Sequence, residues 1–329
     1  MDLGWLPERL DALLAEDVPH GDLTTHLLGI GGASARMQFQ MRAAGVVCGI
    51  ETAAALIVRA GAQAEVVAPS SSRVEAGAVL LRANGSAGAI HRAWKVSQTL
   101  VEYLSGIATT TAAIVDAARA VAPGISIVTT RKTFPGAKAP MIAAIRAGGA
   151  EPHRLGLSET LLVFPEHRVF LGDPASAIAR LRQAAPEKKV VIEVASLEEA
   201  AAMVSIADVL QCEKMTPQDI ASVVQMVAAS SVRTLVAAAG GVNAANAAAY
   251  AQAGAHILVT SAPYWAAPAD VKVTLGPACP RVCSGFSPTW NHDEKHHVGG
   301  GATGSVANPP NASPPRRERT PQSPNSAEK

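Results

Sequence analysis

The feature that most constrains the fold of this chain is the alternation of short apolar runs with alanine-rich segments between about residues 125 and 262. The runs have the length of buried strands, and several of the segments between them have helical periodicity. Ser196, Thr216 and Asn243 occupy expected N-cap positions of three such helices. Repeated strand–helix units predict a parallel sheet and, in this number, an α/β barrel. The runs are 125–129, 161–164, 190–194, 209–212, 234–238 and 257–260, and the helical segments are 197–204, 217–228 and 244–253.

The first part of the chain has a different pattern, with strand-like segments separated by turns around one short helix. These elements predict a small α+β domain over residues 1–104, which precedes a barrel domain over residues 105–273. Two helices are expected to lead into the barrel, with the boundary near Ser105-Gly106. The strand-like segments are 35–42, 64–67 and 79–83, and the helices are 51–60, 89–104 and 109–121.

The end of the chain, residues 274–329, is expected to be a disordered tail. From Pro277 onward it is rich in Pro, Ser, Gly, Asn and charged residues, and such a segment buries too little apolar area to offset its ordering entropy. Thiols and imidazoles in it are zinc ligands by type, but their spacing matches no standard finger, so an unstructured extension is the favoured interpretation. These residues are Cys279, Cys283, His292, His296 and His297.

Charge and composition limit the partners of the protein. A net charge of +1 over 329 residues leaves no broad basic surface for a nucleic acid, so a pocket for a small molecule is the better expectation. Residues 1–16 have the pattern of an amphipathic helix without a signal peptide, and no apolar run reaches membrane-spanning length. We therefore expect a cytoplasmic protein without membrane contact. Cys48 and Cys212 lie in apolar segments, as buried thiols do in a reducing compartment.

Polar residues follow most of the predicted barrel strands. In a parallel barrel the reacting groups lie where strands end, so these residues are expected at one mouth. Cations there can bind carboxylate or phosphate oxygens, whereas acids can accept hydrogen bonds from sugar hydroxyls or hold a magnesium ion on a pyrophosphate. The cations and the imidazole are Arg131, Lys132, His153 and Arg154, the acids are Glu193 and Glu213, and the other strand-end residues are Gly240, Gly241, Thr260 and Ser261.

Each of these residues also has an ordinary structural explanation. The Arg131-Lys132 pair fits a solvated loop, Glu193 a buried ion pair and His153 a helix cap. The Gly240-Gly241 pair fits a plain turn, although it also precedes a predicted helix whose N-terminus would seat a phosphate. Their joint placement at strand ends is what favours a functional site.

The motifs resemble those of nicotinate-nucleotide pyrophosphorylase, also called quinolinate phosphoribosyltransferase, over residues 5–272. Further details are similar to a sister group, the ModD pyrophosphorylases associated with molybdenum transport. The motifs shared with the first group lie at 105–109, 130–136, 153–154, 192–194 and 240–241, and those closer to the ModD group lie at 16–25, 131–136, 152–160 and 237–243.

This resemblance implies a type II phosphoribosyltransferase-like fold, with an N-terminal α/β sandwich domain and an incomplete α/β barrel of about seven strands. It implies a pentosyltransferase in which a nitrogen nucleophile displaces pyrophosphate from phosphoribosyl pyrophosphate with Mg²⁺ present. It also implies a homodimer or higher even oligomer with shared active sites, in which Lys95 reaches the partner's site. The implied catalytic residues are Lys132, Glu193 and Glu213, with Arg131, His153 and Arg154 on the acceptor.

Departures from the family pattern concern the acceptor side. Phe164 stands where the family has a lysine, Lys95 replaces an arginine, and residues 237–239 are alanines in place of Glu-Ser-Ser. Losing one charged hydrogen bond weakens binding of a dicarboxylate by about 1.5–3 kcal/mol. An acceptor other than quinolinate is therefore the first hypothesis. Quinolinate phosphoribosyltransferase activity in NAD synthesis and a non-catalytic binder of molybdate or a phosphorylated ligand are the alternatives.

Overall fold

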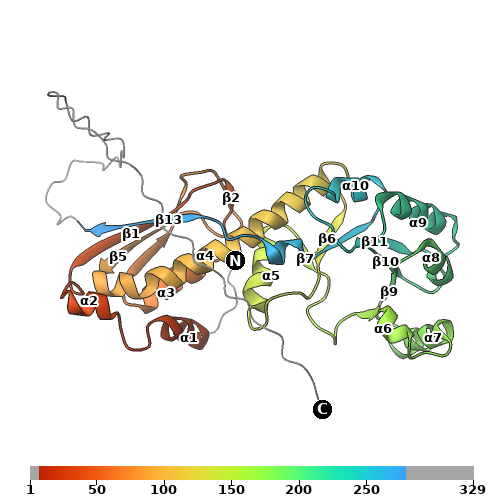
Figure 1. The fold of residues 1–329 in the computed structure, drawn as a ribbon, viewed down its shortest axis with the longest axis horizontal. Coiled ribbons are helices and arrows are strands. Elements are labelled where there is room, and N and C mark those ends of the chain that lie inside the picture. Colours follow the sequence, from red (N-terminus) through yellow and green to blue (C-terminus); the bar gives the residue numbers. More distant parts are fainter. Residues whose placement is uncertain (1–6, 279–329) are drawn as a thin grey trace, which may run out of the picture. The chain divides into compact units, whose positions relative to one another are not determined.

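A computed structural model of the protein describes residues 7–278. These residues form two large sheets, each with its own hydrophobic core, and one small two-stranded sheet. The long helix α4 (Ala87–Arg119) contributes side chains to both cores. Figure 1 shows α4 extending from the first sheet toward the second. No helix within the described residues is long and apolar enough to cross a membrane.

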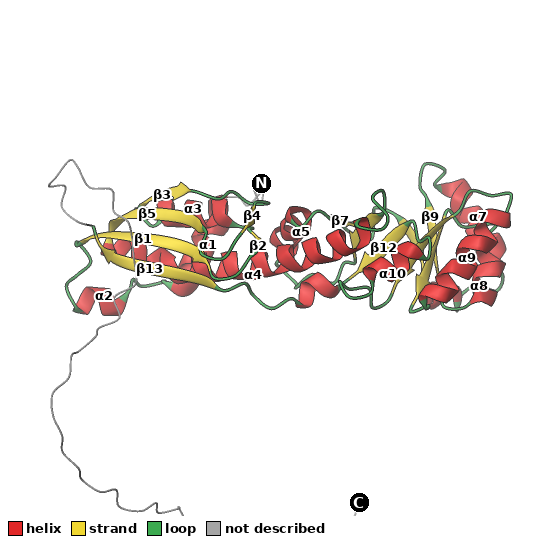
Figure 2. Ribbon diagram, turned by 90° about the horizontal axis from the view of Figure 1, so that it is seen from above, coloured by secondary structure: helices red, strands yellow, loops and turns green. Residues whose placement is uncertain are grey.

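The first sheet has the strand order β13-β1-β5-β3 and is antiparallel. Figure 2 shows its strands side by side. In β1 every second residue is buried, from Ala35 to Met41, because successive side chains point to opposite faces of a strand. Helices α3 and α4 cover that buried face. The bounds are β1 (Ser34–Met41), β3 (Gln63–Val66), β5 (Val79–Ser86), β13 (Val271–Pro277) and α3 (Ile50–Arg59).

Strand β13 corrects the predicted start of the tail. We expected disorder from residue 274, but β13 continues to Pro277 and pairs with β1, where Pro277 lies opposite Ala35. Val271 is buried, and Val273 and Leu275 pack against the same core. The pairing partner lies more than 200 residues earlier in the chain, so local composition could not indicate it. The predicted zinc-type residues from Cys279 onward lie outside the described residues.

Helix α4 also corrects a prediction. Two helices separated near Ser105-Gly106 were expected, but one helix of 33 residues runs through this position. A Cβ at Gly106 would collide with the backbone of Ala267 and Ala269, so this glycine permits a close approach of two segments and does not end a helix. Ser105 attaches the helix to another segment by accepting a hydrogen bond from the backbone N–H of Cys48 (3.0 Å).

The second sheet has seven parallel strands in the order β7-β6-β12-β11-β10-β9-β8. The first strand in sequence, β6, pairs with the last, β12, which curls the sheet into a barrel. The end strands β7 and β8 do not pair with each other, so the barrel is open at this position, which we term the seam. The predicted incomplete barrel is therefore confirmed. The strands are β6 (Ser126–Thr129), β7 (Glu151–Pro152), β8 (Leu161–Val163), β9 (Val190–Val194), β10 (Val209–Glu213), β11 (Leu235–Ala239) and β12 (Ile257–Thr260).

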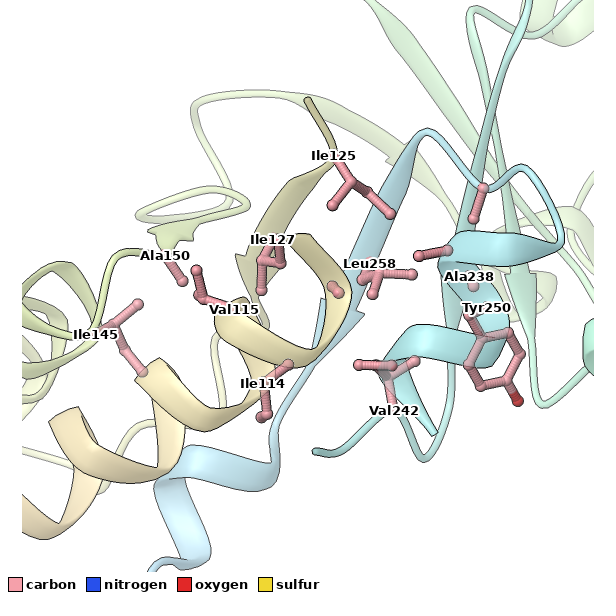
Figure 3. Packing of buried hydrophobic residues seen from close by; sticks show 14 of the residues in the cluster. Ile114, Val115, Ile125, Ile127, Ile145, Ala150, Ala238, Val242, Tyr250 and Leu258 are labelled. Carbon is pink, nitrogen blue, oxygen red and sulfur yellow. The ribbon is translucent and has the colours of Figure 1, made fainter. Parts of the chain in front are cut away.

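The two faces of this sheet have different neighbours. Alternate residues such as Ile127, Ala238 and Leu258 pack outward against the helices, together with Ile114 and Val115 of α4 (Figure 3). A smaller apolar cluster lines the inner face. Because orientation alternates along a strand, Glu193, Gln211 and Glu213 share that inner face with this cluster. The inner cluster contains Val191, Val209, Ala237, Ala239 and Val259.

The remaining elements connect and cover the sheets, and two of the predicted caps are correct. Ser196 accepts a hydrogen bond from Glu199 N, and Thr216 forms a capping box with Asp219. Cys48 and Cys212 are buried and free, as predicted, and burial raises the pKa of both thiols to about 12. The other elements are α1 (Pro7–Asp17), α2 (Leu23–Leu27), β2 (Gly45–Val46), β4 (Arg73–Val74), α5 (Lys138–Ala147), α6 (Pro165–Arg168), α7 (Pro174–Ala184), α8 (Leu197–Met203), α9 (Pro217–Ala229), α10 (Ala247–Gln252) and the 3₁₀ helix η1 (Ala262–Trp265).

Candidate active site

A cavity of about 770 Å³ lies at the carboxyl ends of the barrel strands. Its lining comes from the ends of the strands and from the loops that follow them, which is where a parallel barrel places its reactive groups. Most of the residues predicted from the sequence meet in this one cavity. They are Arg131, Lys132, His153, Arg154, Phe164, Glu193, Glu213, Gly240, Gly241 and Ser261.

Two carboxylates and an amide form the inner wall. Glu193 of β9 lies beside Gln211 of β10 in the parallel register, and the Gln211 side-chain amide donates to Glu193 Oε2 (2.9 Å). Glu213 follows Gln211 by two residues and therefore points to the same face. Burial raises the pKa of Glu193, the neighbouring Glu213 raises it further, and the Gln211 hydrogen bond offsets part of the increase. Two acids held close together in this way suit a cation or a set of hydroxyl groups.

Gln211 is a site residue that we did not predict. Only 6% of its surface is exposed, and its side chain orients Glu193. A polar residue inside the otherwise apolar run 209–212 was the available signal, because glutamine is rarely buried without a partner. Arg168, after β8, supports the same acid from the backbone side by donating to the Glu193 carbonyl oxygen (3.1 Å).

Cations form another part of the lining. Arg154 is 7% exposed, and its Nη1 donates to the backbone oxygen of Thr160 (3.3 Å). Burial and the nearby Arg131 both lower the pKa of Arg154, so the site favours an anion that would offset their repulsion. Burial, followed by the charge of Arg154, lowers the pKa of His153, which is therefore neutral at neutral pH. The guanidinium carbon of Arg154 lies 5.9 Å from the centre of the Phe164 ring.

The glycine pair forms a corner next to Glu213. Gly240 has φ +81° and Gly241 has φ +106°, a region that side chains disfavour. A Cβ on Gly240 would lie 2.7 Å from Glu213 Oε1 and 2.6 Å from the backbone nitrogen of Lys214, so only glycine fits there. Lys214 also lines the cavity and has a left-handed backbone with φ +57°. It adds a cation at this corner that our candidate set did not include.

The predicted phosphate seat at a helix N-terminus is wrong in its details. Helix α10 begins at Ala247, and Asn243 lies in the turn before it, so the glycine pair does not open the helix. The side-chain amides of Asn243 and Asn246 both donate to Gly241 O and fold the turn back onto the glycines. These local hydrogen bonds compete with a helical start, as asparagine side chains commonly do.

Thr260 also differs from the prediction. It is 2% exposed, it does not line the cavity, and its hydroxyl donates to Val242 O (2.6 Å). That bond attaches β12 to the loop that carries the glycine pair. Ser261, one residue later, does line the cavity, and its hydroxyl lies 2.8 Å from the Thr130 hydroxyl. Ser261 therefore keeps the predicted position, and Thr260 has a structural role.

Lys95 lies outside this cavity. It is an exposed residue of α4 with its Nζ 3.2 Å from Gln98 Oε1 and 4.5 Å from the centre of the Trp94 ring. Within one copy of the described chain it joins a different groove, between α1, α4 and the loop around Phe134. Its expected role in a partner's site stays a prediction. Among the described residues, no group of three or more His, Cys, Asp or Glu side chains could hold a metal ion.

Comparison with known proteins agrees with this architecture. Residues 22–105 match the N-terminal domain of quinolinate phosphoribosyl transferase, and residues 107–274 match its C-terminal domain. The chain belongs to the quinolinate phosphoribosyl transferase family.

Within this family, the chain is similar to proteins named "Putative pyrophosphorylase ModD". It is 46% identical over 242 residues to the one from Rhodobacter capsulatus, with 73% of this chain and 93% of the relative covered. It is 39% identical over 271 residues to the one from Pasteurella multocida, with coverage of 81% and 96%. The crystal structure of nicotinate-nucleotide pyrophosphorylase from Ehrlichia chaffeensis has the same fold, with a TM-score of 0.76, 22% identity and coverage of 83% and 99%.

Proposed function

We propose that this protein is a ModD-type phosphoribosyltransferase, which transfers the phosphoribosyl group of phosphoribosyl pyrophosphate to the ring nitrogen of an anionic heterocycle. The observation that carries the proposal is the division of one cavity into an acidic wall, with Glu193 and Glu213, and a cationic wall, with Arg131 and Arg154. The acidic wall suits a ribose, and the cationic wall suits the carboxylate of an acceptor.

The reaction follows from this division. The bond between the anomeric carbon and the pyrophosphate oxygen breaks, pyrophosphate leaves with the electron pair, and the nitrogen lone pair forms the new bond. Positive charge develops on the ribose, where the carboxylates of Glu193 and Glu213 stabilise it electrostatically. His153, neutral at neutral pH, and Arg154 orient the acceptor. Lys132 and Lys214 face the same cavity, where they would contact phosphate oxygens.

Magnesium fits the acidic wall, because Mg²⁺ is usually held by one or two carboxylates together with substrate phosphates. Glu193 and Glu213 would hold the ion indirectly when pyrophosphate is bound, and the ion would supply positive charge that neutralises the leaving group. A homodimer with shared sites is part of the same proposal. In it, exposed Lys95 would reach the cavity of the partner.

The acceptor in this proposal is not quinolinate. Phe164 offers an aromatic face in the cavity at the position of a family lysine, so a dicarboxylate would lose one charged contact there. Ala237 and Ala239 line the inner face beside Gln211 and Glu213 without adding any polar group. The molybdenum link rests on the resemblance to the ModD group.

Pyrophosphate release tests the proposal. Purified protein would be mixed with phosphoribosyl pyrophosphate, Mg²⁺ and a panel of pyridine and azole carboxylates that includes quinolinate. We expect release with a monocarboxylate of the panel and little with quinolinate. Formation of nicotinate mononucleotide from quinolinate at a normal enzyme rate would support the NAD-synthesis alternative. Absence of both release and phosphoribosyl pyrophosphate binding would contradict a transferase.

A further inference from the structure

A second cavity, of about 1040 Å³, lies at the seam of the barrel, between the loop after β7 and the helices α6 and α7. We term it the annex. It shares lining residues with the candidate active site, so the two cavities meet along a common wall. The shared residues are Arg131, Arg154, Leu162 and Phe164.

The annex is apolar away from this wall. Leu157, Ile178 and Leu181 line it together with Phe170, and both Leu157 (73%) and Phe170 (86%) are largely exposed. Glu166 is the one acidic residue in its described lining. Large exposed apolar side chains around a hollow generally indicate a binding surface. An apolar group is therefore a better occupant than a second anion.

The annex also contains a polar group without a partner among the described residues, next to the common wall. Thr160 lines the annex, and its hydroxyl is buried without a hydrogen-bond partner in the described structure. Its backbone oxygen accepts from Arg154, whose guanidinium also faces the active-site cavity. An unpartnered buried hydroxyl is uncommon in a native protein, so the Thr160 hydroxyl is available to a polar atom of a bound molecule.

Phe164 determines how a ligand could pass from one cavity to the other. Its backbone N–H donates to His167 Nδ1 (2.9 Å), and its ring stacks on His167 with the centres 5.7 Å apart. The ring is thereby held in the shared wall and offers an aromatic face beside the guanidinium of Arg154. Planar aromatic rings suit both of these neighbours.

We propose that the annex binds an apolar extension of the acceptor. The acceptor would then be a heteroaromatic acid with a fused or attached hydrocarbon ring, whose carboxylate contacts Arg131 and Arg154 and whose ring lies against Phe164. This inference rests on the proposed function and adds a substrate class to it: a bicyclic or aryl-substituted acid takes the place of a single-ring acid.

A matched pair of probes tests the annex by calorimetry. Pyridine-3-carboxylate and isoquinoline-4-carboxylate carry the same carboxylate and ring nitrogen, and only the second has a fused hydrocarbon ring. We expect the isoquinoline to bind about tenfold tighter or more, from burial of its additional ring carbons. Equal affinities, or no binding of the isoquinoline, would overturn the proposal.

Two tryptophan variants of α7 locate the effect. Ala177 lines the annex, whereas Ala179, two residues later on the same helix, is exposed and lies outside the lining. Ala177→Trp should fill the annex and abolish the preference for the isoquinoline, and Ala179→Trp should retain it. A preference that survives in Ala177→Trp would overturn the proposal. So would a smaller oligomer for Ala177→Trp alone, because the annex would then be a contact between copies of the chain.

Phosphoribosyl pyrophosphate binding on the same samples separates this inference from the proposed function. If the sugar phosphate binds to all variants and the isoquinoline preference is absent, the annex proposal alone fails. If the preference depends on Ala177 but no sugar phosphate binds, the annex is real and the transferase proposal fails.

Discussion

Replacing Glu193 by glutamine is expected to stabilise the fold while it weakens binding of the sugar phosphate. In the folded protein the Glu193 carboxylate is half-buried and lies near Glu213, and both conditions raise its pKa. A raised carboxyl pKa means that the charged form is less stable in the fold than in the unfolded chain. A neutral side chain of the same shape removes this penalty.

The size of the effect follows from the contacts of this side chain. Each unit by which folding raises a pKa corresponds to about 1.4 kcal/mol. The amide oxygen of a glutamine would still accept the hydrogen bond of Gln211, so that contact is kept. Because solvent screens a partly exposed charge, we expect Glu193→Gln to add up to about 1 kcal/mol to the free energy of unfolding near neutral pH, the usual size of such an interaction. This corresponds to about 2–4 °C in Tm.

The pH dependence has a definite sign. Since the folded-state pKa is raised above the unfolded value, Glu193 is protonated in both states at low pH, and its penalty is then absent. The penalty appears as the pH rises past the unfolded-state pKa and is complete above the folded-state pKa. Wild type and Glu193→Gln should therefore have similar stability at about pH 4 and differ at about pH 7.5.

Urea unfolding at both pH values measures this difference. Glu187→Gln serves as the matched control, because Glu187 is an exposed acid outside the cavity lining. A Glu193→Gln variant that is no more stable than wild type at the higher pH would refute the electrostatic account. So would a stability gain of equal size at both pH values, because only removal of a charge depends on pH in this way.

Five further substitutions test the geometry of the site. Gly240→Ala should destabilise the fold by at least about 1 kcal/mol in urea unfolding and weaken sugar-phosphate binding, because its Cβ would clash with the turn after β10. Gly241→Ala should have the smaller effect on binding, because a Cβ at that position meets nothing within 4 Å. Thr260→Val should lower the free energy of unfolding by about 1–2 kcal/mol and leave ligand affinity nearly unchanged. Ser261→Ala should instead weaken ligand binding and leave stability nearly unchanged, so equal binding losses in the two variants would contradict the assigned roles. Arg154→Lys keeps a charge but loses the planar fork, so acceptor affinity should fall about tenfold with phosphoribosyl pyrophosphate affinity retained, as measured by calorimetry.

The barrel and most of its site could be predicted from the sequence because both depend on local patterns. Apolar runs of strand length gave the positions of strands such as β9 and β12, and the residues that follow each strand gave the positions of Arg131, Glu193 and Glu213. In a parallel barrel, the end of a strand is enough to place a residue at the mouth. Distances and pairings within the cavity then required the structure.

Elements that depend on a distant partner were not predictable in this way. The strand β13 needs β1 beside it, and α4 continues through Gly106 because another segment packs against that glycine. Thr260 and Ser261 are adjacent in sequence, and the sequence does not indicate which of the two faces the cavity. Gln211 was not predicted, because the role of a single polar residue within an apolar strand becomes clear only when its acidic neighbour on the adjacent strand is known.

The central claim is that the acidic wall of this cavity binds a sugar phosphate. Calorimetry with phosphoribosyl pyrophosphate and Mg²⁺, repeated with molybdate, tests it most directly on wild type, Glu193→Gln and Glu213→Gln. We predict saturable binding of phosphoribosyl pyrophosphate to wild type, with a loss of this binding alone in both variants. Sugar-phosphate binding that is undiminished in the variants would contradict the claim. The claim would also be contradicted, and a non-catalytic oxyanion binder supported, if wild type bound no sugar phosphate and molybdate binding became tighter when either acid was removed.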